Sequence, residues 1–280
     1  MKTPEQLKGA IRNMAKEKKI AAQDILQIFM FERVIERLSK SDYRENFILK
    51  GGLLISAMVG IAERTTMDMD TTVKGIRMEE DQLWEAVKNI LDISLEDGVA
   101  FEIKDIQPIR EEDDYNNFRI SVQGIYGKMR IPMKIDITTG DTIIPSEIIY
   151  QYPFLFEDKT VSVMTYPIET ILAEKYETII RRNVETTRSR DFYDLHLLFQ
   201  IYQDRADWKL LRQATYATAK KRKSLIKLED SERIIQALKQ SDSITLLWQA
   251  YQRRNEYAHG ISYEDVMDSV EKYAEMIGGN

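Results

Sequence analysis

A glycine pair followed by two aspartates constrains the fold of this chain more than any other feature. Gly51 and Gly52 follow the apolar run Phe47–Leu49. Asp68 lies sixteen residues after Gly52, and Asp70 lies two residues further on. Short apolar runs bounded by glycine are typical of buried strands. The pattern predicts three elements in order: a strand over 47–49, a short helix over 53–60 and a second strand over 65–73.

This segment has the residue types of a phosphate and metal site. Glycine lets a backbone approach a phosphate closely, and carboxylates two residues apart on a strand project from one face. The alternation predicts Thr66, Asp68 and Asp70 on the polar face and Met67 and Met69 in the core. Thr65 adds a hydroxyl and Arg64 a positive charge. The alternative is an exposed acidic strand edge with no ligand.

A third carboxylate would complete a site for phosphoryl chemistry. Asp136 lies in the alternating run Ile131–Thr138, in which the polar residues are Lys134, Asp136 and Thr138. Three acids on two neighbouring strands could hold two divalent ions about 4 Å apart. Asp136 could also act as a general base for the attacking hydroxyl. Its alternative role is that of a solvated strand residue.

A lysine and two aspartates of the C-terminal part form a second candidate group. Lys175 falls in a predicted helix, 168–182, and could meet a triphosphate as a point charge. Asp191 is predicted at the start of the next helix, where a carboxylate caps free N–H groups, and Asp194 could be structural. Four arginines give the connecting segment a positive character that could steer a nucleic acid or stay solvated: Arg181, Arg182, Arg188 and Arg190.

Other chemical groups have more ordinary interpretations. The basic run 220–223 could grip a polynucleotide but is better explained as a solvated helix end. We expect His196, which falls on a predicted helix, to pack or to form a hydrogen bond. We expect Trp248, Tyr251 and Tyr257 to belong to the core, although aromatic side chains can also stack on bases.

Composition narrows the chemistry further. The 280 residues carry a net charge of −6, so a nucleic acid would have to meet a local basic surface. Without cysteine and with only two histidines, a thiolate or multi-histidine metal site is excluded. Any metal must bind carboxylate oxygen, which suits Mg²⁺ or Mn²⁺. No apolar run suffices to span a membrane and the N-terminus has no secretory signal pattern, so we expect a cytoplasmic protein.

The element pattern predicts an α+β protein with an all-α tail. Antiparallel strands are predicted over 99–109, 118–126 and 129–138, with a hairpin turn within 124–128. From about residue 166 onward the periodicity is helical. We therefore predict three parts: an N-terminal helical segment at 1–45, an α+β domain at 46–165 and a C-terminal helical domain at 166–280.

Taken in this order and spacing, the motifs resemble those of the AbiEii/AbiGii nucleotidyltransferase toxins, which include the MenT enzymes. The resemblance runs from about residue 47 to the C-terminal helix. It is carried by Leu49–Gly52 with Arg64–Asp70, by Lys134–Ile137, and by Lys175 with Arg190–Leu195. Many relatives have serine where this chain has Thr66, a change that keeps the hydroxyl.

The resemblance implies a polymerase-β-like nucleotidyltransferase domain joined to a helical domain, with the active site between them. It implies that Asp68 and Asp70 bind metal, that Lys175 contacts the nucleotide phosphates and that Asp191 is needed for activity. Family members are toxins neutralised by a cognate antitoxin, and some add nucleotides to the 3′ end of tRNA.

We therefore expect a Mg²⁺-dependent enzyme that transfers a nucleoside monophosphate from an NTP to RNA, with tRNA as the leading acceptor. It would be the toxin of a bacterial abortive-infection or toxin–antitoxin pair. One alternative is the same chemistry on a protein hydroxyl or a small molecule, which the net acidity favours. The other is a non-catalytic binding module, against which the intact Asp68, Asp70, Lys175 and Asp191 argue.

Overall fold

The computed structural model describes residues 3–109 and 117–278, and the chain divides into two compact units. The first unit comprises Met1–Asp141 and Ile148–Thr165, and the second comprises Thr142–Glu147 and Tyr166–Asn280. The chain therefore leaves the first unit after Asp141, returns to it at Ile148 and leaves it again after Thr165. No helix of the described residues is long and apolar enough to cross a membrane.

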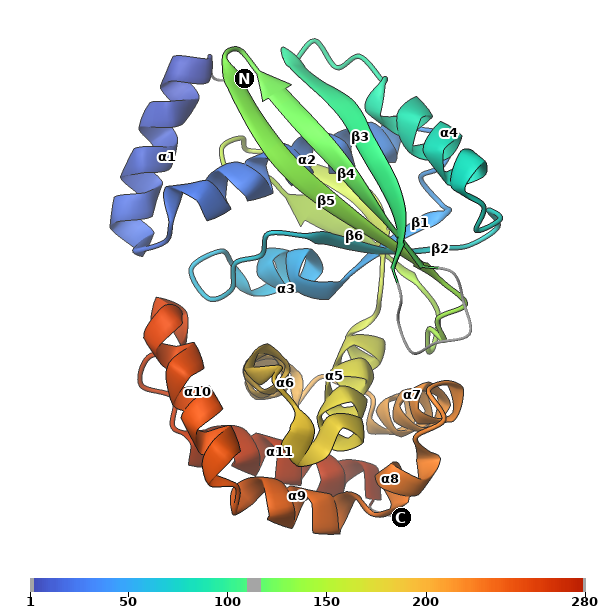
Figure 1. Ribbon diagram of the computed structural model, residues 1–280, viewed down its shortest axis with the longest axis vertical. Coiled ribbons are helices and arrows are strands. Elements are labelled where there is room, and N and C mark those ends of the chain that lie inside the picture. The colour runs from blue at the N-terminus through green and yellow to red at the C-terminus, as the bar shows by residue number, and fades with distance from the viewer. Residues whose placement is uncertain (1–2, 110–116, 279–280) are drawn as a thin grey trace. The chain divides into compact units, whose positions relative to one another are not determined.

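The first unit is built on one mixed sheet with the strand order β3-β4-β5-β2-β1-β7-β6 (Figure 1). Strands β3, β4 and β5 form an antiparallel meander, β5 is parallel to β2, β2 is antiparallel to β1, and β1 is parallel to β7. The elements of this unit are α1 (Pro4–Lys18), α2 (Ala22–Lys40), β1 (Phe47–Lys50), α3 (Gly51–Val59), β2 (Met69–Val73), α4 (Glu80–Leu91), β3 (Val99–Ile109), β4 (Asn117–Tyr126), β5 (Met129–Thr139), β6 (Ile148–Pro153) and β7 (Thr160–Thr165).

Helix α2 covers one face of the meander and leaves the other face polar. Figure 1 shows α2 running behind β3–β5. A Cβ placed on Gly124 would fall within 3.1 Å of Met133 Sδ and would also overlap Met30 of α2, so the strands and the helix pack tightly there. Strand β5 alternates as predicted, with Ile131, Met133, Ile135 and Ile137 buried. Asp136 is on the opposite face, because successive side chains of a strand alternate between its two faces and Asp136 lies between Ile135 and Ile137.

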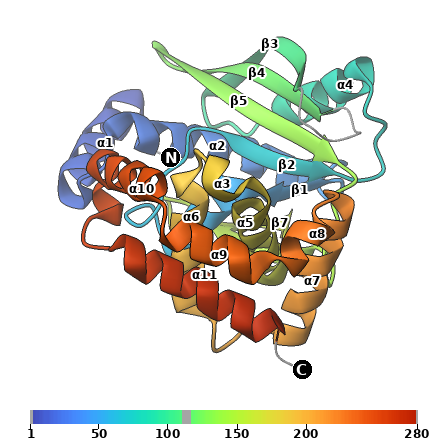
Figure 2. The same ribbon diagram turned by 60° about the horizontal axis from the view of Figure 1, so that its bottom comes forward.

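The second unit is a helical bundle arranged around α5. Its helices are α5 (Ile168–Arg182), α6 (Ser189–Tyr202), α7 (Trp208–Lys221), α8 (Leu225–Glu229), α9 (Ser231–Lys239), α10 (Asp242–Arg254) and α11 (Tyr263–Gly278), with 3₁₀ turns at Asn183–Glu185 and Glu256–Ala258. Helices α9 and α11 run side by side (Figure 2). In the core, Tyr176 stacks on Tyr273 with ring centroids 4.4 Å apart, and the Tyr273 hydroxyl lies 2.8 Å from Thr215 Oγ1.

The predicted α+β class with a C-terminal helical part is confirmed. Capping boxes are present at Thr3 and Ser262. Each side chain accepts a hydrogen bond from the backbone N–H three residues later, and the side chain of that residue accepts one from the backbone N–H of Thr3 or Ser262. His196 is hydrogen-bonded as predicted, with its Nδ1 2.8 Å from Ser269 Oγ.

The predicted start of β2 is wrong. The strand begins at Met69, after an irregular segment, so strict alternation does not reach back to residue 65. As a result Met67, predicted to be buried, is 43% exposed, and Thr66, predicted on the polar face, is buried. Strand β6 and the five-residue helix α8 had no predicted counterpart, because both are too short to show a clear period.

Candidate active site

Four charged residues form a row across the polar face of the sheet. Lys50 of β1 is paired with Asp70 of β2, Asp70 with Asp136 of β5, and Asp136 with Arg119 of β4. Paired residues of adjacent strands project from the same face of a sheet. The charges along the row are therefore positive, negative, negative and positive, with the two carboxylates at the centre.

Arg119 holds Asp136 in a bidentate ion pair. The Arg119 Nε and Nη2 atoms each donate a hydrogen bond of 2.7 Å, one to each carboxylate oxygen of Asp136. The hydrogen bond to Asp136, together with the charges of Asp136, Asp68 and Asp70, raises the pKa of Arg119 above its ordinary value. Arg119 is thus a permanent cation that interacts with the predicted acids Asp68, Asp70 and Asp136.

The acids suit a metal that shares its coordination with a substrate. Among residues 3–109 and 117–278, no cluster of three or more Asp, Glu, His or Cys side chains is placed to hold a metal ion by itself. Mg²⁺ is nevertheless commonly bound by one or two carboxylates and by substrate phosphates. Asp68, directly before β2, and Asp70, within it, provide that donor set, whereas Asp136 has both oxygens bound to Arg119.

The two glycines make room for side chains of the protein itself. Gly51 starts α3 with a φ of +66°, and a Cβ there would fall 2.7 Å from Asp70 Cγ. A Cβ on Gly52 would fall 2.7 Å from Thr66 Oγ1 and 3.0 Å from an Arg64 guanidinium nitrogen. The pair therefore permits Asp70, Thr66 and Arg64 to pack against the first turn of α3. A direct contact between these glycines and a phosphate remains a prediction.

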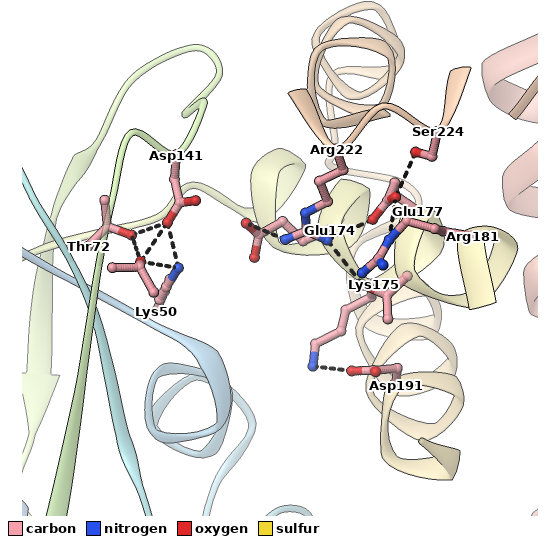
Figure 3. Close-up of polar contacts among 12 residues, drawn as sticks. Lys50, Thr72, Asp141, Glu174, Lys175, Glu177, Arg181, Asp191, Arg222 and Ser224 are labelled. Atoms are coloured by element: carbon pink, nitrogen blue, oxygen red, sulfur yellow. Dashed lines mark hydrogen bonds and ion pairs between the residues drawn. The ribbon is translucent and has the colours of Figure 1, made fainter. Parts of the chain in front are cut away.

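Lys50 belongs to a second polar network at the end of the same sheet (Figure 3). Its Nζ lies 2.6 Å from Asp141 Oδ2 and donates a 2.7 Å hydrogen bond to Thr138 Oγ1. The Thr72 hydroxyl also donates to Asp141 Oδ2 and lies 3.1 Å from Thr138 Oγ1. Asp141, where the chain first leaves the first unit, is thereby tied to three strands, and the Lys50 ammonium is held on the polar face.

In the helical unit, Lys175 of α5 is held by two buried carboxylates of α6. Its Nζ lies 2.8 Å from Asp191 Oδ1 and 2.8 Å from Asp194 Oδ2 (Figure 3 shows the first of these). Arg188 pairs with the other oxygen of Asp191 at 2.5 Å. Burial alone would raise the pKa of Asp191, but Lys175 and Arg188 hold it below its ordinary value.

Asp191 lies in the first turn of α6, but the predicted capping role is wrong. The N-cap residue is Arg188, and this end of the helix has no side-chain capping hydrogen bond. The carboxylate is used for ion pairs because two cations lie within reach. Of the basic run 220–223, Arg222 has a structural role, since it pairs with Glu177 of α5 at 2.7 Å (Figure 3).

Neither Arg119 nor Asp141 was predicted from the sequence to belong to the site. Arg119 could have been found, because a two-residue turn at Gly127–Lys128 fixes the hairpin register and pairs residue 119 with residue 136. Asp141 had no comparable signal. It follows the end of β5, and only the tertiary structure brings it to Lys50.

Comparison with known protein families gives a match over most of the chain. Residues 33–271 match the model of a protein family described as nucleotidyl transferase AbiEii toxin, type IV toxin–antitoxin system. The chain belongs to this family. It is therefore a nucleotidyltransferase, and the family implies an antitoxin partner. No curated protein sequence matches the chain.

Two solved structures from Helicobacter pylori share the fold of this AbiEii-family protein. One is a candidate nucleotidyltransferase with a TM-score of 0.51 and 16% identity, and the match covers 92% of this chain and 98% of the other. The other is the JHP933 protein, with a TM-score of 0.50, 16% identity, and coverage of 92% and 94%. At this identity the likeness shows the fold.

Proposed function

We propose that this AbiEii-family toxin transfers a nucleoside monophosphate from an NTP to RNA in a Mg²⁺- or Mn²⁺-dependent reaction. The observation that carries the proposal is the charged row on the sheet, in which Asp70 and Asp136 are neighbours and a cation stands at each end. Such a row can hold a triphosphate–metal complex, because carboxylates bind the metal and cations balance the phosphates.

The acids of the row and the residues next to them have separate proposed roles. Asp68 and Asp70 would hold the metal, which when bound would neutralise phosphate charge during transfer. Asp136 would serve as a third ligand or as a general base only after Arg119 releases at least one of its oxygens. Arg64 and Thr66, packed against Gly52, would support the first turn of α3 next to the nucleotide.

Lys175 and Asp191 are proposed to act from the helical unit. Asp191 and Asp194 both pair with the largely buried Lys175 ammonium and so compensate its charge. It would then contact the nucleotide phosphates as a point charge. Asp191 would position this ammonium without itself touching the substrate.

The proposed setting is a bacterial cytoplasm, where the protein would act in abortive infection against phage and would be neutralised by its antitoxin. We propose tRNA as the first acceptor to test, because terminal transfer to tRNA would stop translation. The same chemistry on a protein or a small molecule would appear as label in those fractions.

The test is transfer from labelled NTPs into fractionated cell extract, with Mg²⁺ or Mn²⁺ and with EDTA. We expect label in RNA, lost with EDTA and reduced at least a hundredfold in Asp70→Asn and Lys175→Met. Asp105→Asn is the matched control, because Asp105 is an exposed acid on β3 outside the row. The proposal of an RNA acceptor would be contradicted if the folded wild-type protein transferred label to protein or small molecules and transferred none to RNA from any NTP.

A further inference from the structure

The helical unit contains a cavity of about 400 Å³ between the start of α6 and the last turns of α10. Arg188 and Arg190 line it from α6 and its N-cap, and Arg254 lines it from α10. No acidic side chain of the described residues contributes to its lining. The volume falls within the range of small-molecule binding sites.

Two of the three arginines carry charge that the protein leaves uncompensated. Arg188 forms an ion pair with Asp191. Within the described residues, Arg190 and Arg254 form no ion pair, and both are exposed. The protein has a net charge of −6, so two arginines without ion pairs at one cavity give it a local positive charge that favours binding of an anion.

Besides the arginines, Thr187 and Ser189, the lining has an apolar wall on α10. Tyr251 stacks on the buried Trp248 with ring centroids 5.6 Å apart, and its hydroxyl lies 3.1 Å from the Tyr257 hydroxyl. Leu247 and Ala250 of α10 extend this wall. Tyr251, predicted to belong to the core, is half-buried and also borders the cavity.

We propose that this pocket binds one nucleotide of the single-stranded end of the RNA acceptor. Arg190 and Arg254 would contact backbone phosphates, and the wall formed by Tyr251 and Leu247 would pack against the base or ribose. Cations beside an aromatic platform are how single-stranded nucleic acids are commonly held. An acidic peptide would use the cations but would gain little from the apolar wall. The inference rests on the proposed function, since it assigns the RNA acceptor a place.

The test measures RNA binding in the absence of NTP, so that it does not depend on catalysis. A fluorescent twelve-nucleotide single-stranded RNA is titrated with wild type, with the double variant Arg190→Ala/Arg254→Ala, and with Arg253→Ala. Arg253 is the matched control, because it is an exposed arginine of the same helix that does not line the cavity. Circular dichroism and thermal unfolding establish that each variant is folded.

We expect the double variant to weaken RNA binding about tenfold and Arg253→Ala to change it less than about twofold. Each phosphate contact on a single strand contributes about −0.7 to the slope of log K against log salt, so the slope of the double variant should be less negative by about 1.4. Equal binding by the double variant and wild type, equal loss in Arg253→Ala, or no RNA binding by wild type would overturn the inference. So would an equal loss of binding to a poly-glutamate peptide, which would assign the pocket to an acidic protein segment.

Parallel transfer assays separate this inference from the proposed function. If wild type labels RNA but the double variant binds RNA normally, the pocket assignment fails and the RNA transferase stands. If the double variant loses RNA binding but wild type labels no RNA, the pocket stands as an RNA site and transfer to RNA fails.

Discussion

Asp70 packs against Gly51 so closely that a Cβ on the glycine would lie 2.7 Å from the Asp70 Cγ atom. The glycine also has a φ of +66°, a conformation that L side chains rarely adopt. One position therefore combines a conformational and a steric requirement for glycine, and the steric one involves a proposed metal ligand.

Gly51→Ala is expected to reduce nucleotidyl transfer at least tenfold and to lower the free energy of unfolding by about 1–3 kcal/mol. Gly260→Ala is the matched control, because Gly260 also has a positive φ, of +84°, but its Cβ would meet nothing within 4 Å. Urea unfolding and labelled-NTP transfer measure both effects. Equal activity in the two variants would show that displacement of Asp70 has no effect on the reaction.

Arg119→Gln is expected to increase the stabilisation of the protein by Mg²⁺ or Mn²⁺. Arg119 occupies both oxygens of Asp136 and is attracted to Asp68 and Asp70, so it competes with a cation for the same carboxylates. Because the pair is partly exposed, its loss alone should cost less than about 1 kcal/mol. Thermal unfolding with and without metal measures the difference. A smaller metal-induced rise in Tm than in wild type would contradict this account.

Asp191→Asn is expected to destabilise the protein by about 2 kcal/mol at pH 7 and by progressively less as the pH falls below 4. Lys175 and Arg188 overcome the effect of burial and lower the pKa of Asp191 in the folded protein. The ionised carboxylate therefore stabilises the fold above pH 4, and this contribution is lost as pH falls through the folded-state pKa. Urea midpoints of wild type and variant across this range give the measurement. A difference that does not change with pH would exclude titration of Asp191 as its source.

Glu32→Gln is expected to stabilise the protein at pH 8 and to have little effect at pH 4.5. Burial raises the pKa of Glu32 to about 8, although its Oε1 accepts a 2.7 Å hydrogen bond from the Leu155 N–H. Between these pH values the unfolded chain releases this proton while the folded protein keeps it. Wild-type stability should therefore fall, by at most about 1.4 kcal/mol per pH unit from this group, as pH rises.

Glutamine keeps the hydrogen-bond acceptor but does not titrate, so the stability difference between variant and wild type should grow from pH 5 to pH 8. Chemical unfolding at four pH values measures it. A constant difference would show that Glu32 is ionised in the folded protein throughout this range.

Strands with a long, regular period were predictable because burial on one face fixes the alternation. The run from Ile131 to Thr138 is the example: its buried side chains and the outward Asp136 are as predicted, and the hairpin turn adds the register. Met67 shows where such a prediction fails. The predicted alternation was carried back from Met69 to residue 65, but the segment before Met69 is not a strand.

Partnerships between distant side chains were not predictable in the same way. The sequence marked Lys175, Asp191 and Asp194 as chemically important but did not indicate that one ammonium is held by both carboxylates. That arrangement depends on how α5 packs against α6. Likewise, the glycine pair was assigned to phosphate approach, whereas the space beside it is filled by Asp70, Thr66 and Arg64.

The path of the chain between its two units limits how the helical unit can be exchanged between relatives. Residues 142–147 belong to the helical unit, where Ile144 and Thr170 of α5 exchange two hydrogen bonds of 2.9 Å, while the hairpin β6–β7 that follows belongs to the sheet unit. A recombination event with a single breakpoint at residue 166 would separate α5 from these partners. Swapping the helical unit between relatives therefore requires the 142–147 segment to be transferred with it.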